Sequence, residues 1–393
     1  MAKRGDELWM WLVLVFGAGS KRLWNCADGC VDAQKLCEAA KAHELTGMND
    51  GELDRADRIT FEDAQKLIET AENDGIQVVA YGDENYPERL KELAAPPAVL
   101  FCRGDLRLMN EGSILHMVGT RQPSKYTLSL VNVMCAELAV RGFTISSGGA
   151  EGVDAKALET ALGRGGRALM VCPAPLESER SCGNEELREL VAEKGLMISE
   201  YPTGYKGMMN FRRRNEVAVA LSSAVIIAEA GEQSKGLDNV KQAQALGRPV
   251  MVVPPHLLYS ERYFGQKELL RQGYTAIFDG EDAVRVLTEC GKVEKGSYGL
   301  QGGSVKISAE PAKKQRKNTR EKPVHKTEKP DYSGLGEQAK AICGLLEEHG
   351  SLLADELAEK TGLPVLEVLM HLTELELEGL AESLPGKQYR LKS

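Results

Sequence analysis

The most informative part of this chain is Ser146-Ser147-Gly148-Gly149-Ala150-Glu151-Gly152-Val153-Asp154. It follows an apolar, strand-like run and opens a helix-like run. Glycine permits a tight turn and close approach of a ligand, and the free N–H groups at a helix N-terminus attract negative charge. A second such turn, Gly119-Thr120-Arg121, lies one βα unit earlier. With no obvious catalytic base beside either turn, the pair predicts binding of a nucleotide or phosphate polymer rather than chemistry on it.

Short apolar runs alternate with helix-like runs on both sides of these turns. We expect strands at Ile114–Val118, Phe143–Ser147, Ala168–Cys172, Leu196–Ser199, Ala224–Ala228 and Val250–Val253, and helices at Lys125–Arg141, Val153–Arg164, Glu185–Lys194 and Gly236–Leu246. This alternation predicts an α/β fold with a Rossmann-like, doubly wound, mostly parallel sheet. In such sheets ligands bind beyond the carboxyl ends of the strands, where both glycine turns lie.

Composition limits the possible functions. The chain has 393 residues, enough for two or three domains, and a net charge of −9, so any nucleic-acid contact must be a local basic groove. Nine cysteines without metal-type pairs indicate free thiols rather than a metal site, and a reducing cytoplasm. No cofactor is expected. The apolar run Leu8–Gly17 is too short to span a membrane and is interpreted as a first helix rather than a signal peptide.

Changes in the pattern of apolar, charged and glycine residues along the chain predict four regions. Residues 1–75 are expected to form a small helical domain of the SAM or helix-hairpin-helix type, 76–290 the Rossmann-like core, 291–333 a disordered basic linker and 334–393 a winged helix. The turn Gly17–Lys21 is either a phosphate site or a plain interhelical turn, and the second is favoured. The linker, with its cations between Lys313 and Lys322, is either a solvated tether or a nonspecific nucleic-acid contact.

The C-terminal region has the pattern of three helices and a hairpin. The expected elements are Ala339–Glu348, Ala354–Glu359, Val365–Glu378 and the hairpin within Leu380–Leu391. A winged helix that reads duplex DNA needs a basic third helix, but this one carries Glu367, Glu374, Glu376 and Glu378. We therefore expect a protein contact or a regulatory role instead.

Five motifs in order and register are similar to those of the bacterial DNA-processing protein A (DprA/Smf) family. They are Val118-Gly119-Thr120-Arg121, Ser147 to Asp154, Ser199-Glu200-Tyr201-Pro202-Thr203-Gly204, Phe211-Arg212-Arg213-Arg214-Asn215 and Gly247-Arg248-Pro249-Val250. The resemblance covers essentially the whole chain. It implies binding of single-stranded DNA, loading of the RecA recombinase during natural transformation and recombination, a homodimer formed through the core, and no catalysis. It also implies a cytoplasmic protein without membrane contact.

The residues give this resemblance a physical basis. Arg121 can bind a phosphate through several N–H donors of its planar guanidinium, although a structural salt bridge is the alternative. An aromatic ring beside cations suits unpaired bases, although Phe211 could also be core. Asp154 and Asn215 are interpreted as mainly structural. The expected DNA-binding residues are Gly119, Thr120, Arg121, Ser147, Gly148, Gly149, Phe211, Arg212, Arg213, Arg214 and Asn215, with Lys206 and Arg262 as possible extensions.

The chain also departs from the family pattern. Glu151 and Glu216 stand where the family usually carries arginine, Leu158 where histidine is common, and Pro254-Pro255 where Pro-Gly is usual. An anion near a phosphate site weakens binding. We therefore expect weaker binding than in a typical relative, partly compensated by Arg212 and Arg213, and still a preference for single strands.

Two other functions remain as alternatives. One is an enzyme that processes nucleoside monophosphates, but the Pro-Gly-Gly-x-Gly-Thr signature of such Rossmann-like enzymes is absent. A dehydrogenase is disfavoured because no G-x-G-x-x-G opens the first βα unit, and His116 and His256 are interpreted as ordinary residues. The other alternative is a sensor that binds a small nucleotide in the same pocket.

Overall fold

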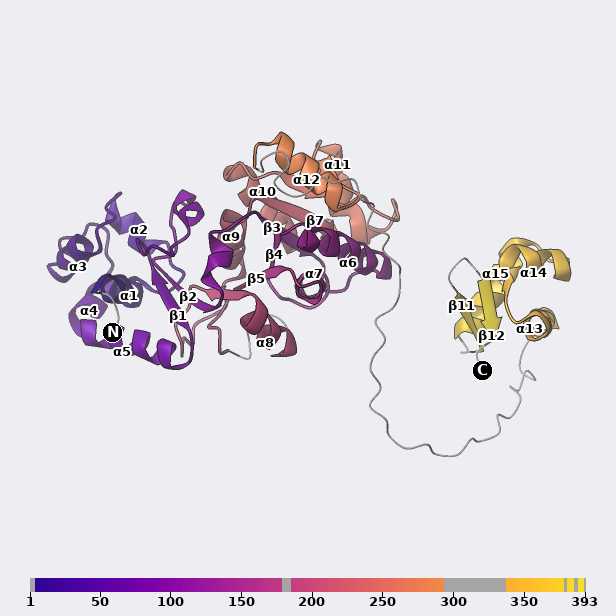
Figure 1. Ribbon diagram of the computed structural model, residues 1–393, viewed down its shortest axis with the longest axis horizontal. Coiled ribbons are helices and arrows are strands. Elements are labelled where there is room, and N and C mark those ends of the chain that lie inside the picture. The colour runs from indigo at the N-terminus through magenta and orange to yellow at the C-terminus, as the bar shows by residue number, and fades with distance from the viewer. Residues whose placement is uncertain (1–3, 179–184, 293–336, 378–379, 385–387, 392–393) are drawn as a thin grey trace, which may run out of the picture. The chain divides into compact units, whose positions relative to one another are not determined.

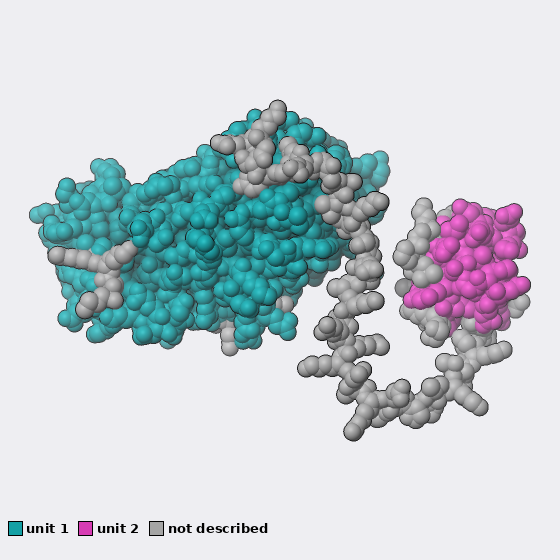
Figure 2. All heavy atoms as spheres, viewed as in Figure 1, with its two compact units in different colours: residues 1–309 teal, residues 310–393 magenta. Residues whose placement is uncertain are grey.

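The computed structural model describes residues 4–178, 185–292, 337–377, 380–384 and 388–391. The chain divides into two compact units, residues 1–309 and 310–393, shown in different colours in Figure 2. The expected basic linker and its charge cluster lie outside the described residues.

The N-terminal helices wrap around one apolar helix. Trp11 of that helix is fully buried, and its indole Nε1 donates a 2.8 Å hydrogen bond to the carbonyl oxygen of Ile59. The same hydrophobic core includes Val99 and Phe101 from the sheet, so the helices and the sheet share buried surface. The domain boundary at residue 75 remains a prediction. The helices are α1 (Arg4–Phe16), α2 (Arg22–Ala27), α3 (Ala33–Lys41), α4 (Asp50–Arg58) and α5 (Phe61–Asn73).

The nine-stranded sheet confirms the predicted Rossmann-like α/β fold. Its order is β1-β2-β6-β5-β4-β3-β7-β8-β9, and pairing is parallel from β6 to β9, with β1 and β2 added antiparallel at one edge (Figure 1). The strands are β1 (Gln77–Ala80), β2 (Val99–Gly104), β3 (Ile114–Gly119), β4 (Thr144–Ser147), β5 (Arg167–Cys172), β6 (Leu196–Ser199), β7 (Ala224–Glu229), β8 (Val250–Val252) and β9 (Thr275–Ala276).

Helices cover both faces of the sheet because successive side chains point to opposite sides. Leu115 and Met117 of β3 pack into a core with α6, α7 and α12, whereas Ile114 and Val118 pack into cores with α9 and α10. The helices are α6 (Lys125–Val140), α7 (Val153–Gly163), α8 (Glu185–Lys194), α9 (Phe211–Leu221), α10 (Asp238–Ala245), α11 (Phe264–Arg271) and α12 (Gly280–Glu289). Four short 3₁₀ helices lie at Glu88–Glu92, Leu106–Met109, Lys235–Leu237 and Glu261–Tyr263.

The C-terminal unit has the architecture of a winged helix. Buried Ile342, Leu346, Leu357 and Leu372 join its three helices in one core. The hairpin is extended by a third short strand, giving a sheet with the order β10-β12-β11. The elements are α13 (Glu337–His349), β10 (Leu352–Leu353), α14 (Ala354–Thr361), α15 (Val365–Leu377), β11 (Ala381–Leu384) and β12 (Gln388–Leu391).

The described residues also bear on membrane spans and on the state of the cysteines. None of the helices in the described ranges is long and apolar enough to cross a bilayer. The eight cysteines that the structure describes are free thiols, and burial raises the pKa of Cys37 and of Cys135 to about 12.

Candidate nucleic-acid interface

The two glycine turns contact each other at the carboxyl edge of the sheet. β3 ends at Gly119 and its parallel neighbour β4 ends at Ser147. The backbone N–H of Val153 donates a 3.2 Å hydrogen bond to the Thr120 carbonyl oxygen. A Cβ at Gly152, where φ is +89°, would lie 2.5 Å from that same oxygen. Glycine is therefore required at residue 152 by the joining of the turns.

Residues of the turns divide into exposed and structural ones. Arg121 is exposed and makes no ion pair with any residue in the described ranges, and Thr120 is half-buried. Ser147 is buried, and its Oγ donates a 2.8 Å hydrogen bond to the Met117 carbonyl oxygen. Gly119 packs against Val153, whose Cγ2 lies 2.5 Å from where a Cβ would be. Of these four predicted residues, Arg121 has the free guanidinium that a phosphate contact needs.

Arg214 connects the second glycine turn to the aromatic ring. Its guanidinium lies so close to Gly148 that a Cβ there would be 1.3 Å from Nη1. Nη1 also donates a 3.4 Å hydrogen bond to the carbonyl oxygen of Val171 at the end of β5. On its other side the guanidinium carbon lies 5.9 Å from the centroid of the Phe211 ring. The structure thus brings Phe211, Arg214 and Gly148 together. Arg214, Gly148 and Gly149 are buried, however, so they support the ring and the turn from inside and do not present the solvent-facing groups expected from the sequence.

Asp154 and His116 both lie within the electrostatic influence of Arg214. Burial raises the pKa of Asp154, while Arg214 and hydrogen bonds from Ser147, Gly148 and Ala150 oppose the rise. Burial, together with the positive charge of Arg214, lowers the pKa of His116 to about 3, so this histidine is neutral. A neutral histidine inside a strand fits the interpretation of His116 as an ordinary core residue.

Helix α9 presents Phe211 to solvent because of its first turn. The side chain of Asn210 caps the helix by accepting a 3.0 Å hydrogen bond from the Arg213 backbone N–H. Phe211 keeps 43% of its surface exposed, and Arg212 is exposed beside it. Lys206 is exposed in the preceding loop, and Asn215 is half-buried.

Arg213 differs from the expectation that it faces DNA. It is only 3% exposed, and its Nε and Nη2 donate hydrogen bonds of 2.7–3.1 Å to the Glu200 carboxylate. Glu200 is also buried. Burial raises the pKa of its carboxyl group, whereas the charge of Arg213 and its hydrogen bonds lower it. The sequence motif contained Glu200, but nothing in the spacing showed that it would hold Arg213. The guanidinium of Arg213 is therefore turned inward, and its expected compensating role is lost.

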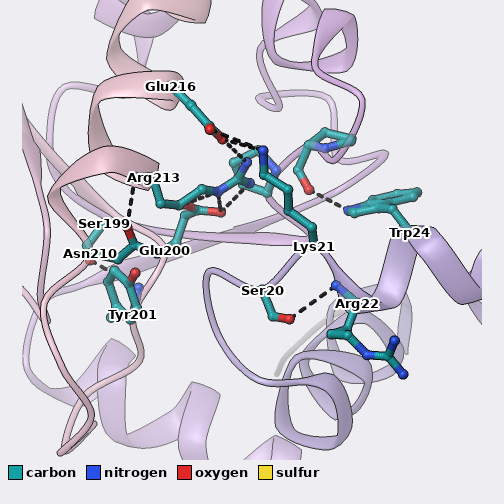
Figure 3. Close-up of polar contacts among 12 residues, drawn as sticks. Ser20, Lys21, Arg22, Trp24, Ser199, Glu200, Tyr201, Asn210, Arg213 and Glu216 are labelled. Carbon is teal, nitrogen blue, oxygen red and sulfur yellow. Dashed lines mark hydrogen bonds and ion pairs between the residues drawn. The ribbon is translucent and has the colours of Figure 1, made fainter. Parts of the chain in front are cut away.

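Glu216 has a partner in the N-terminal region. Its carboxylate lies 3.0 Å from Lys21 Nζ and 3.3 Å from Arg213 Nη1, and Figure 3 shows these groups together with Glu200. Lys21 ends the Gly17–Lys21 turn, whose Gly19 packs against the Tyr201 hydroxyl. Gly19 is thus required by close packing within the protein, and the plain interhelical turn remains a prediction. The anion at residue 216 is neutralised within the protein.

Arg262 is also held by an acidic side chain. Its Nη1 lies 2.9 Å from the carboxylate of Glu229, which is fully buried at the end of β7, and 2.6 Å from the Gln122 carbonyl oxygen. The other Glu229 oxygen accepts a 3.0 Å hydrogen bond from the Ser124 backbone N–H. Arg262 therefore fixes the loop that follows Arg121, while 45% of its side chain remains exposed.

Known proteins with this architecture identify the family. The fold is a Rossmann-like α/β core followed by a winged helix. The chain belongs to the family described as DNA recombination-mediator protein A, whose sequence model matches residues 77–288, more than half of the chain. Residues 326–387 match the DprA winged helix domain. Both matches confirm the predicted family and the predicted winged helix.

Three relatives illustrate the extent of the similarity. The DNA processing protein DprA of Bacillus subtilis is 31% identical over 57% of this chain and 75% of its own length. Protein Smf of Escherichia coli is 27% identical over 98% of this chain and 96% of its own. The X-ray structure of DprA from Streptococcus pneumoniae superposes with a TM-score of 0.61 at 22% identity, over 72% of this chain and 98% of that chain. This last likeness supports the fold.

Proposed function

We propose that this protein binds single-stranded DNA along the carboxyl edge of its sheet, as a binder without catalytic activity. The observation that carries the proposal is the half-exposed Phe211 ring, packed against the buried Arg214 and Gly148, at the same sheet edge as the exposed Arg121. A half-exposed ring offers a stacking surface for an unpaired base, and the exposed Arg121 and Arg212 offer donors to the backbone. The family's role in recombination and the relatives' names as DNA processing proteins support a nucleic-acid ligand.

The same proposal covers the partners and the compartment. Acting in the cytoplasm, the protein would load RecA onto the bound strand as a homodimer formed through the core, in recombination and in natural transformation. The description of the family as recombination mediators supports a recombinase as partner. The test is RecA assembly on a long single strand with and without this protein. Unchanged assembly would remove RecA from the proposal but leave the DNA site in place.

The DNA site is tested by fluorescence anisotropy with a labelled oligonucleotide. The wild type is expected to bind the single strand at least tenfold more tightly than the duplex of the same sequence. Equal affinity for both would contradict the proposal. Saturable binding of a mononucleotide with no gain from longer oligomers would instead favour the small-nucleotide sensor. Release of base from nucleoside monophosphates would favour the enzyme.

A further inference from the structure

A second aromatic cluster lies at the same edge of the sheet, beyond β8. The ring of Tyr126 stacks on His256, with centroids 4.5 Å apart and planes 24° apart. Tyr259, three residues after His256, is 92% exposed, and Tyr126 is 40% exposed. Two exposed rings and a stacked imidazole close together on one surface offer faces on which an unpaired base can stack.

The loop that carries Tyr259 is anchored to the protein. Lys267 Nζ donates a 3.0 Å hydrogen bond to the Leu258 carbonyl oxygen and lies 5.9 Å from the Tyr259 ring centroid. Tyr263 Oη donates a 2.8 Å hydrogen bond to Ser124 Oγ, the N-cap of α6. These hydrogen bonds hold the Tyr259 loop in place before binding. The loop therefore loses little conformational entropy when a base stacks on its ring.

This cluster continues the proposed DNA site. Arg262 joins the loop to the Gln122 carbonyl, next to Arg121. Arg214 lies at the end of β5, and the Tyr259 loop follows β8. The sheet order places four strand intervals between β5 and β8, roughly 19 Å at about 4.8 Å each. The exposed ring of Phe211, the exposed guanidinium of Arg121 and the exposed ring of Tyr259 thus follow one another along one edge of the sheet. Several nucleotides of a single strand would span this distance.

We propose that Tyr259, with the Tyr126–His256 stack, is a second base-stacking platform that lengthens the single-stranded DNA site beyond the Phe211 cluster. This inference rests on the proposed function and assigns it further binding residues. Lys267 supplies positive charge beside the Tyr259 ring, which suits a polyanion better than an apolar protein segment. Because stacking is largely independent of sequence, the platform adds affinity for longer strands without adding base preference.

The experiment compares oligo(dT) of about 6 and about 20 nucleotides. Tyr259→Ala is expected to weaken binding of the longer strand about tenfold and to leave the shorter one within twofold, because the short strand is held at the Phe211 end. The slope of log K against log salt should not change, since a ring is removed and no phosphate contact. Tyr259→Phe should keep the wild-type affinity, and Leu258→Ala in the same loop is the matched control.

Three results would overturn the platform. The first is that Tyr259→Ala and Leu258→Ala bind the long strand equally well. The second is an equal loss for short and long strands. The third is a change in the sedimentation of Tyr259→Ala, which would mark the loop as a contact between copies of the chain. Failure of the wild type to bind any oligonucleotide is distinct from all three, because it would refute the proposed function itself.

Discussion

Arg213 and Glu200 are joined by three hydrogen bonds of 2.7–3.1 Å in an interior position. The neighbouring Arg212 is exposed and has no ion-pair partner in the part of the chain that the structure describes. Two adjacent arginines of one motif therefore serve different purposes. One stabilises the fold, and the other is available to a ligand.

Substitution of each arginine by methionine should separate these roles. Arg213→Met leaves the buried Glu200 carboxylate without its partner and is expected to lower the free energy of unfolding by about 3–5 kcal/mol. Arg212→Met should change that free energy by less than about 0.5 kcal/mol. It should instead reduce the slope of log K against log salt for single-stranded DNA by about 0.7. Urea unfolding and anisotropy titrations measure both quantities, and the reverse pattern would contradict the assignment.

A methyl group at Gly148 should displace the guanidinium of Arg214. The new Cβ would meet Nη1 at 1.3 Å, so Arg214 must leave its place beside Phe211. Gly148→Ala is expected to cost about 1–3 kcal/mol of stability through overpacking and to weaken binding of single-stranded DNA. Gly163→Ala, in α7 with open space around it, is the matched control and should not destabilise. Equal behaviour of the two variants in thermal unfolding would refute the contact.

The ion pair between Lys21 and Glu216 joins residues 195 positions apart in the sequence. Its contribution can be measured by exchanging the two charges. Lys21→Glu and Glu216→Lys each place like charges together, the second also beside Arg213. The double variant restores the attraction between residues 21 and 216. A double-mutant cycle in urea is expected to give a coupling energy of about 0.5–1 kcal/mol, because Lys21 is half-exposed. Strict additivity would show that the pair does not hold the N-terminal helices to α9.

The fold was largely predictable from local patterns, but part of the site was not. The strands ending at Gly119 and Ser147 are short apolar runs followed by glycine, so the sequence predicts both turns and their shared edge. The helix from Phe211 onward was not expected, although Asn210 is a readable N-cap. At about 100° per residue, a helix turns Arg213 away from Phe211 and returns Arg214 toward it. The contact of Lys21 with Glu216 depends on tertiary packing and leaves no local pattern.

Stability at acidic pH should depend on Glu52. The side chain is buried, and hydrogen bonds of 2.7–2.8 Å from Arg22 hold its pKa below the usual value against the opposing effect of burial. Because its pKa is lower in the folded than in the unfolded state, Glu52 stabilises the folded protein at pH values above its unfolded pKa of about 4.3. This stabilisation is lost as the pH falls through the pKa of Glu52 in the folded state.

Glu52→Gln removes the charge and keeps an oxygen for the cap of α4. The wild type is expected to have a higher Tm than this variant at pH 7, and the difference should shrink as the pH falls below about 4. Glu72→Gln, at an exposed position of α5, should show no such dependence. A difference that stays constant down to pH 3 would show that the charge of Glu52 does not contribute.

In the proposed complex Arg121 and Phe211 hold a single strand by different forces, and a salt titration separates the two. Binding of labelled oligo(dT) is measured at several salt concentrations for the wild type, Arg121→Ala and Phe211→Ala. We predict that Arg121→Ala reduces the slope of log K against log salt by about 0.7. We predict that Phe211→Ala weakens binding by about 1–3 kcal/mol at every salt concentration without changing the slope. Wild-type affinity and slope in both variants would contradict the account.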